Sequence, residues 1–132
     1  MSLQNHANSL ITALIAFNSI LNPKSSKREC VNYALEINQM QGKHMTVGAT
    51  AYYGDPLTYT GTVPKVGRTI AVDPKIIPYG TRVYIPQFNK IFIAEDCGSK
   101  IKGNRIDIFM NTYDECMKWG FRDIEIILLD QE

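Results

Sequence analysis

The chain lacks a bias of charge: 14 basic and 13 acidic residues leave a formal net charge of +1 over 132 residues. Domains that bind nucleic acid usually carry a clustered excess of positive charge, so we expect no nucleic-acid partner. The apolar fraction of 45% and the charged fraction of 20% are typical of a globular protein. A chain of this length is expected to form one hydrophobic core.

Metal-binding spacings are also absent. The three cysteines, Cys30, Cys97 and Cys116, form no CxxC pair, and the two histidines lie far apart in the sequence. Three cysteines cannot all pair within one chain, so we expect neither a disulfide-stapled scaffold nor a metal site. One bridge with a free thiol and three free thiols are both consistent with the sequence.

No apolar run is long enough to span a membrane. The most apolar stretch, residues 10–21, is preceded by no basic residue, whereas a signal peptide normally begins with one. The helical spacing of Leu10, Leu14 and Phe17 predicts an amphipathic helix that ends before Pro23. A signal or anchor remnant is the alternative interpretation.

A second helix is predicted after residue 25. Ser26 and Glu29 have the spacing of a capping box, and Gly42 is a typical helix stop. Residues 1–42 are therefore predicted to form an N-terminal helical hairpin. This hairpin is also a candidate for contacts in a homodimer.

The remaining sequence is rich in Val, Ile, Thr and Tyr and is interrupted by turn residues. One helix is predicted over residues 111–120, with Thr112 as its N-cap and Gly120 as its stop. Six short strands within about 85 residues favour a small closed barrel, because closure removes exposed strand edges. The predicted strands are 46–53, 68–72, 81–86, 90–95, 105–109 and 123–129.

A charged loop joins two of these strands, from Asp96 to Asp107. Its length matches a calcium-binding EF-hand loop, but a lysine and an isoleucine stand at the fifth and sixth places, where a ligand and glycine are needed. The segment GSKIKG (98–103) is not a phosphate-binding loop, since the GxxxxGK[ST] pattern is missing. Cys97 as a nucleophile has no partner base placed nearby by the sequence, and a half-buried thiol is the simpler interpretation.

Acid–base chemistry by carboxylates is the functional interpretation that remains for this loop. Cleavage of a glycosidic bond needs an acid near the leaving oxygen, and a carboxyl stays protonated when it is partly desolvated beside another carboxylate. On its predicted strand, Asp107 shares a face with Arg105 and Phe109. The alternative is a solvated aspartate paired with Arg105.

Four segments of the β-rich part carry a family resemblance: GATAYYG (48–54), GRTIAVDPKIIPYGTRVYIP (67–86), AEDCGSKIKGNRIDIF (94–109) and WGFRDIEIILL (119–129). Together they resemble the 3D domain, a family named after three shared aspartates. The resemblance covers roughly residues 46–129, and within the family it is to the stationary-phase survival group, which is related in role to resuscitation-promoting factors. It implies a mainly β fold, a six-stranded double-psi β-barrel like the catalytic part of membrane-bound lytic transglycosylase A, with residues 43–132 as the 3D domain.

The three aspartates of this resemblance are Asp73, Asp96 and Asp107. Asp107 matches the family's acid/base, Asp96 a second carboxylate that orients sugar or tunes that acid, and Asp73 the third. The alternative for Asp73 is an aspartate that begins a turn before Pro74. The family usually has Asp-Thr-Gly-Gly where this chain has Asp-Cys-Gly-Ser at residues 96–99.

Substrate-binding residues are implied in the same way. The stretch TAYY resembles one that lines the glycan groove of the transglycosylase relatives, which implicates Thr50, Tyr52 and Tyr53. Lys102 and Arg105 are candidates to keep the carboxylates ionised or to contact peptide-stem carboxylates, or they belong to a solvated turn.

The implied activity is that of a lytic transglycosylase, which cleaves the MurNAc-β-1,4-GlcNAc bond of peptidoglycan glycan strands and leaves 1,6-anhydro-MurNAc ends. Such chemistry needs no cofactor, and the family implies an extracytoplasmic location at the cell wall. A muramidase-type hydrolase and a non-catalytic, expansin-like polysaccharide-binding module are the alternatives, since fold alone does not decide function. A structural module that binds partners through the N-terminal helices is a further one.

Overall fold

The computed structural model describes residues 28, 31, 32, 35 and 40–130. The chain divides into two compact units, and the second, Lys43–Gln131, contains the barrel. In the first unit, Arg28, Val31, Asn32 and Leu35 are helical. The predicted hairpin otherwise lies outside the described residues and stays a prediction, as does its role in a homodimer.

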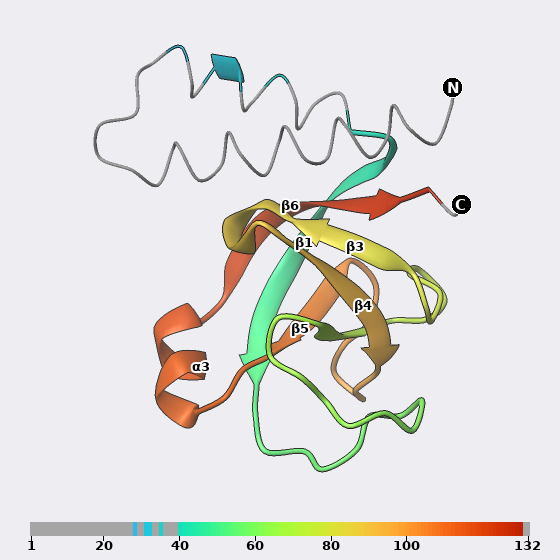
Figure 1. The fold of residues 1–132 in the computed structure, drawn as a ribbon. Helices are drawn as coiled ribbons and strands as arrows, with labels where there is room; N and C mark the ends of the chain where they lie inside the picture. The colour runs from blue at the N-terminus through green and yellow to red at the C-terminus, as the bar shows by residue number, and fades with distance from the viewer. Residues whose placement is uncertain (1–27, 29–30, 33–34, 36–39, 131–132) are drawn as a thin grey trace. The chain divides into compact units, whose positions relative to one another are not determined.

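Six strands form a closed barrel in the order β1-β5-β2-β4-β3-β6 (Figure 1). Parallel pairing joins β1 to β5 and β2 to β4, whereas the other described pairs, β2–β5, β3–β4 and β3–β6, are antiparallel. The sequence-based prediction of a mainly β, six-stranded closed barrel is thus confirmed, and its double-psi character stays a prediction. The strands are β1 (Gly42–Tyr52), β2 (Thr69–Val72), β3 (Arg82–Ile85), β4 (Lys90–Asp96), β5 (Arg105–Phe109) and β6 (Arg122–Leu129).

The predicted strand limits agree with the observed ones to within one or two residues, except at the start of β1. This strand begins at Gly42, four residues before the predicted start. The predicted end of the second helix lies next to residues outside the described ones and stays a prediction. A short 3-10 helix, η1 (Pro86–Phe88), was not predicted. It ends at Asn89, whose left-handed backbone (φ 51°) turns the chain from β3 into β4.

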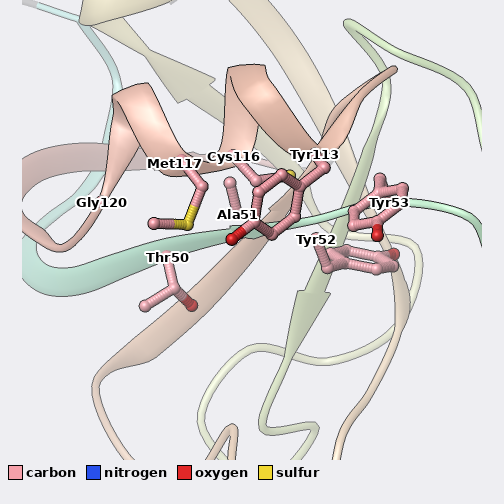
Figure 2. Close-up of a pocket in the computed structure, with 8 residues that line it drawn as sticks. All are labelled: Thr50, Ala51, Tyr52, Tyr53, Tyr113, Cys116, Met117 and Gly120. Atoms are coloured by element: carbon pink, nitrogen blue, oxygen red, sulfur yellow. The ribbon is translucent and has the colours of Figure 1, made fainter.

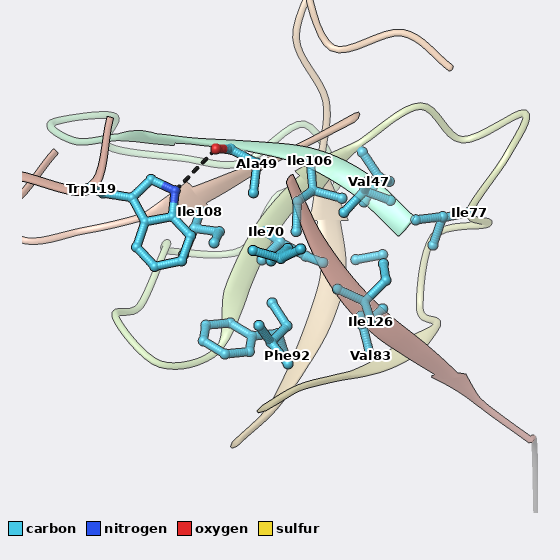
Figure 3. Close-up of a cluster of buried hydrophobic side chains, with 14 of the residues drawn as sticks. Val47, Ala49, Ile70, Ile77, Val83, Phe92, Ile106, Ile108, Trp119 and Ile126 are labelled. Carbon is cyan, nitrogen blue, oxygen red and sulfur yellow. Dashed lines mark hydrogen bonds between the residues drawn. The ribbon is translucent and has the colours of Figure 1, made fainter. Parts of the chain in front are cut away.

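The barrel interior is filled by hydrophobic side chains from every strand, most of them branched aliphatic (Figure 3). Alternation along each strand directs one set inward, and the register places Ile70 of β2 beside Ile108 of β5 and Ala94 of β4. These side chains are essentially inaccessible to solvent. The alternate positions Thr50 of β1, Asp107 of β5 and Ala71 of β2 therefore lie on the opposite face of these adjoining strands.

Helix α3 (Tyr113–Trp119) is the only α-helix among residues 40–130. The Thr112 hydroxyl caps it by accepting from the Glu115 amide at 3.2 Å, and Gly120 ends it with a φ of 66°, as the sequence predicts. Trp119 fixes the helix to the barrel, because its indole N–H donates to the Ala49 carbonyl at 3.1 Å (Figure 3). The helix is thereby held beside the carboxyl end of β1.

Candidate functional site

A row of polar side chains crosses the outer face of the barrel where strands β1, β5, β2 and β4 adjoin. Thr50 of β1 is paired with Asp107 of β5, and Ala71 of β2 is paired with Asp107 on one side and with Asp96 of β4 on the other. Asp107 and Asp96 are thus two strand spacings apart, roughly 10 Å between Cα atoms. Ala71, which is buried, lies between them on β2.

Asp107 lies half-buried in this row. The Thr50 hydroxyl donates to its Oδ1 at 2.9 Å, which fixes the orientation of the carboxyl group. Burial raises the pKa of Asp107 above its ordinary value, and the negative charges of Asp96 and Asp55 act in the same direction. The Thr50 hydrogen bond and the Arg105 charge oppose this shift without cancelling it.

Asp96 is buried and accepts three hydrogen bonds. The Tyr52 hydroxyl donates to Oδ2 at 2.7 Å, and the amides of Tyr59 and Cys97 donate to Oδ1 at 2.9 Å each. Burial, the hydrogen bond to Asp96 and the charge of Asp107 together raise the pKa of the Tyr52 phenol. Tyr52 therefore stays protonated and acts as a hydrogen-bond donor to Asp96.

Asp73 has a different set of contacts. Its Oδ2 accepts from the Gly103 amide at 2.9 Å, and its Oδ1 accepts from the Lys75 amide at 3.1 Å. These two hydrogen bonds lower the pKa of Asp73, and the charge of Lys102 adds to the effect. The carboxylate ties the Asp96–Arg105 loop to the turn that follows β2. These are the contacts of a residue that positions a loop.

The two basic residues of the loop lie at different places. Lys102 is exposed and acts on Asp73 through its charge. Arg105 is half-buried, lies with its guanidinium 5.8 Å from the centre of the Phe121 ring and lowers the pKa of Asp107. Both therefore favour ionised carboxylates, which is one of the two functions that the sequence suggests for them.

An open hollow of about 430 Å³ adjoins the row on the side of β1 (Figure 2). Thr50 and Tyr52 belong both to the row and to the hollow. Tyr53, which is exposed, meets Tyr113 of α3 edge to face with ring centres 6.0 Å apart. The remaining lining residues are Ala51, Cys116, Met117 and Gly120. Thr50, Tyr52 and Tyr53, the predicted substrate-binding residues of β1 and its end, thus all line this hollow.

Sequence reasoning missed a buried cluster around Glu95. The carboxylate binds the guanidinium of Arg68 at 2.8 Å and accepts from the hydroxyls of Thr62 and Thr69 at 3.1 Å each. This cluster fastens the long connection between β1 and β2 to the strand that carries Asp96. The sequence signal for it was the unusual Glu-Asp pair at the end of an apolar strand.

Within residues 40–130 and the four described helical positions, no group of three or more His, Cys, Asp and Glu side chains could hold a metal ion. The same residues include no helix of the length and hydropathy that a bilayer crossing requires.

The family assignment rests on residues 68–130, which match the model of the 3D domain. This segment is a 3D domain. All three aspartates named by the sequence resemblance lie inside the match, whereas Thr50, Tyr52 and Tyr53 lie before it.

Two proteins of Bacillus subtilis (strain 168) are similar to this chain over 101 residues. The cell wall-binding protein YocH is 35% identical, and the putative cell wall shaping protein YabE is 38% identical. Each match covers 70% of this chain, but only 35% of YocH and 25% of YabE. This chain thus spans about a third or less of the length of these relatives.

Two solved structures are also similar to parts of the chain. The lytic transglycosylase LtgG of Burkholderia pseudomallei matches with 32% identity and a TM-score of 0.44, over 55% of this chain and 25% of LtgG. MltA from E. coli matches with 21% identity and a TM-score of 0.48, over 60% of this chain and 29% of MltA.

Proposed function

We propose that this 3D domain acts on peptidoglycan as a lytic transglycosylase, with Asp107 as its acid and base. The observation that carries the proposal is the state of Asp107: a half-buried carboxyl with a raised pKa, oriented by Thr50 and open to a row of polar side chains. Groups with shifted pKa values in an accessible site are candidates for proton transfer. The similarity to a cell wall-binding and a cell wall shaping protein supports peptidoglycan as the target.

In the proposed reaction, protonated Asp107 donates its proton to the glycosidic oxygen as the bond to C1 of the muramic acid breaks. The resulting carboxylate then takes the proton from the C6 hydroxyl of the same sugar. That hydroxyl attacks C1 and closes the 1,6-anhydro ring. One carboxyl group thus serves both steps, and the proton balance is restored at the end of each turnover.

Asp96 has a supporting function in this proposal. Its negative charge raises the pKa of Asp107. The same charge stabilises the positive charge that develops on the sugar in the transition state. Tyr52 holds Asp96 in place and presents its ring to the substrate groove. Asp73 keeps the intervening loop in shape through the Gly103 amide, and it touches no sugar.

The location that accompanies this function is the extracytoplasmic cell wall. Both Bacillus subtilis relatives carry cell wall functions in their names, which supports a chain that meets its glycan outside the cytoplasm.

A second candidate function is binding without cleavage. The observation in its favour is the name of YocH, a cell wall-binding protein that is 35% identical over 101 residues. The exposed rings of Tyr53 and Tyr113 would also suit a surface that holds polysaccharide.

One assay separates these functions. Purified peptidoglycan is incubated with the wild-type chain and with Asp107→Asn, and the soluble products are identified by mass spectrometry. We expect 1,6-anhydro muropeptides from the wild type and a loss of about 10²–10⁴-fold in the variant. Products with reducing ends would instead identify a hydrolase, and sedimentation with the glycan without any release would identify a binding module.

A further inference from the structure

An aromatic pair lies on the other side of the carboxylate pair from the hollow. Tyr59, in the connection between β1 and β2, is 72% exposed and stacks on half-buried Tyr79 with ring centres 5.7 Å apart and planes 27° apart. The outer face of Tyr59 is consequently a flat, fixed and accessible aromatic surface.

Tyr59 is attached directly to the site. Its backbone amide is one of the donors to Asp96 Oδ1, so the main chain that carries the ring is held beside the carboxylate. On either side of Tyr59, the Thr58 amide bonds to the Thr62 carbonyl at 2.8 Å, and the Thr60 hydroxyl donates to the Glu95 carbonyl at 2.7 Å. The main chain around Tyr59 is therefore ordered before a ligand binds, which lowers the entropic cost of binding.

The strand order places the two aromatic regions at opposite ends of the row. The hollow is formed by β1 and α3, Asp107 lies on the next strand, β5, and Asp96 lies on β4, beyond β2. Tyr79 lies next to β4 as well, because the Gly80 amide donates to the Ala94 carbonyl at 2.8 Å. From β1 to β4 the row measures three strand spacings, roughly 14 Å.

We propose that the Tyr59–Tyr79 stack is a second saccharide-binding subsite, so that the glycan is held on both sides of the carboxylate pair. The apolar face of a pyranose ring packs against an aromatic face, and Tyr59 offers such a face at the end of the row. The hollow with Tyr53 and Tyr113 holds the chain on the other side. A glycan polymer held on both sides in this way is bound at an internal segment and not only at its end.

This inference rests on the proposed function for the identity of its ligand, but it concerns binding and not bond cleavage. Tyr59 lies outside residues 68–130, so it belongs to the part of this chain that the family model does not cover. Tyr79 lies inside this range, so the family match covers one of the two rings of the stack.

The experiment measures binding of peptide-free peptidoglycan glycan strands, separated by length from disaccharides to octasaccharides, by titration calorimetry. Asp107→Asn is the background, so that cleavage does not change the ligand. In this background, Tyr59→Ala and Tyr59→Phe are compared with Val63→Ala, which removes an exposed apolar side chain from the same connection without touching the stack.

We expect affinity to rise with strand length until both aromatic regions are occupied. Tyr59→Ala should weaken binding of long strands about three- to tenfold and leave disaccharide binding little changed, whereas Tyr59→Phe and Val63→Ala should bind like the background. An equal effect of Tyr59→Ala on all lengths, no effect at any length, or no binding at all would overturn the subsite. If the wild type releases no product but its affinity still rises with the length of the glycan strand, the proposed cleavage activity is wrong and the proposed subsite is supported.

Discussion

Asp107 and Asp73 are two aspartates of the same domain that differ in environment. Asp107 lies half-buried on a strand and receives one hydroxyl hydrogen bond, whereas Asp73 follows a strand and receives two backbone amide bonds. The pKa of the first is raised by burial, and the pKa of the second is lowered by its amide partners. The comparison teaches that residue type alone does not define a catalytic set, since hydrogen-bond partners decide which carboxyl can carry a proton.

The largest difference in product release between the two positions is expected when each aspartate is lengthened by one methylene group. Asp107→Glu keeps an acid but moves it past the Thr50 hydroxyl, and a displacement of about 1 Å commonly costs about 10²-fold in rate. Asp73→Glu should reduce product release much less, because its carboxyl is not proposed to touch the sugar. Release of muropeptides over time measures both, with Asp123→Glu on the exposed part of β6 as the surface control. Equal losses of muropeptide release at the two positions would contradict the different roles of Asp107 and Asp73.

The next prediction concerns the partners of Asp107 and the pH profile of cleavage. Asp96→Asn removes a charge that raises the pKa of Asp107, so the fall of activity at the alkaline side should move to lower pH. Thr50→Val removes a hydrogen bond that lowers this pKa, so the same limb should move to higher pH. Rates measured across pH 3–9 should therefore show shifts of opposite sign. Shifts in the same direction would mean that another group controls the profile.

Stability against pH should differ between the two aspartates as well. The lowered pKa of Asp73 means that its stabilisation is present above the ordinary aspartate pKa and is lost as pH falls through the folded-state pKa. Asp73→Asn should therefore lower the melting temperature at pH 7 and have a smaller effect in acid. Melting curves at several pH values provide the measurement.

Asp107→Asn should behave in the opposite way. A raised pKa means that ionisation destabilises the fold as pH rises from the ordinary pKa through the folded-state pKa. The amide carries no charge, so the variant should melt at or above the wild-type temperature at pH 7. A lower melting temperature at neutral pH would show that the carboxylate stabilises the site.

The smallest effect is expected at the other end of the Asp73 hydrogen bond. Gly103 has a φ of 68°, a conformation that costs an alanine about 1 kcal/mol, and nothing lies within 4 Å of the position where a Cβ would be added. Gly103→Ala should therefore lower the free energy of unfolding by about this amount, as measured by denaturant titration. In Asp73→Asn the cost of the alanine should be smaller, since the loop is already released there. Full additivity of the two changes would argue against this coupling.

Much of the fold could be predicted because its local signals agree with one another. Branched residues, turn residues and the cap at Thr112 predicted the strand limits and α3, whereas the pairing and register of the strands are known only from the structure. The start of β1 was missed because Lys43 and His44 lack an apolar pattern. The hydrogen bond between Tyr52 and Asp96 joins residues 44 positions apart, which no local pattern encodes.

The resemblance named the residues of the candidate site and roles for Asp107 and Asp96, and these assignments stay predictions. The family resemblance named the three aspartates, but only the contacts show that Asp73 faces backbone amides while Asp107 and Asp96 share a row. The Glu95 cluster and the Tyr59–Tyr79 stack depend on long connections whose course the sequence does not reveal.

The most direct test of the central claim is a carbon-13 NMR titration of the side-chain carboxyls in the wild-type chain, with each aspartate assigned by its asparagine variant. The account predicts that Asp107 titrates above the ordinary aspartate pKa and Asp73 below it within the same sample. An Asp107 that titrates at or below the pKa of Asp73 would contradict the assignment of Asp107 as the proton carrier.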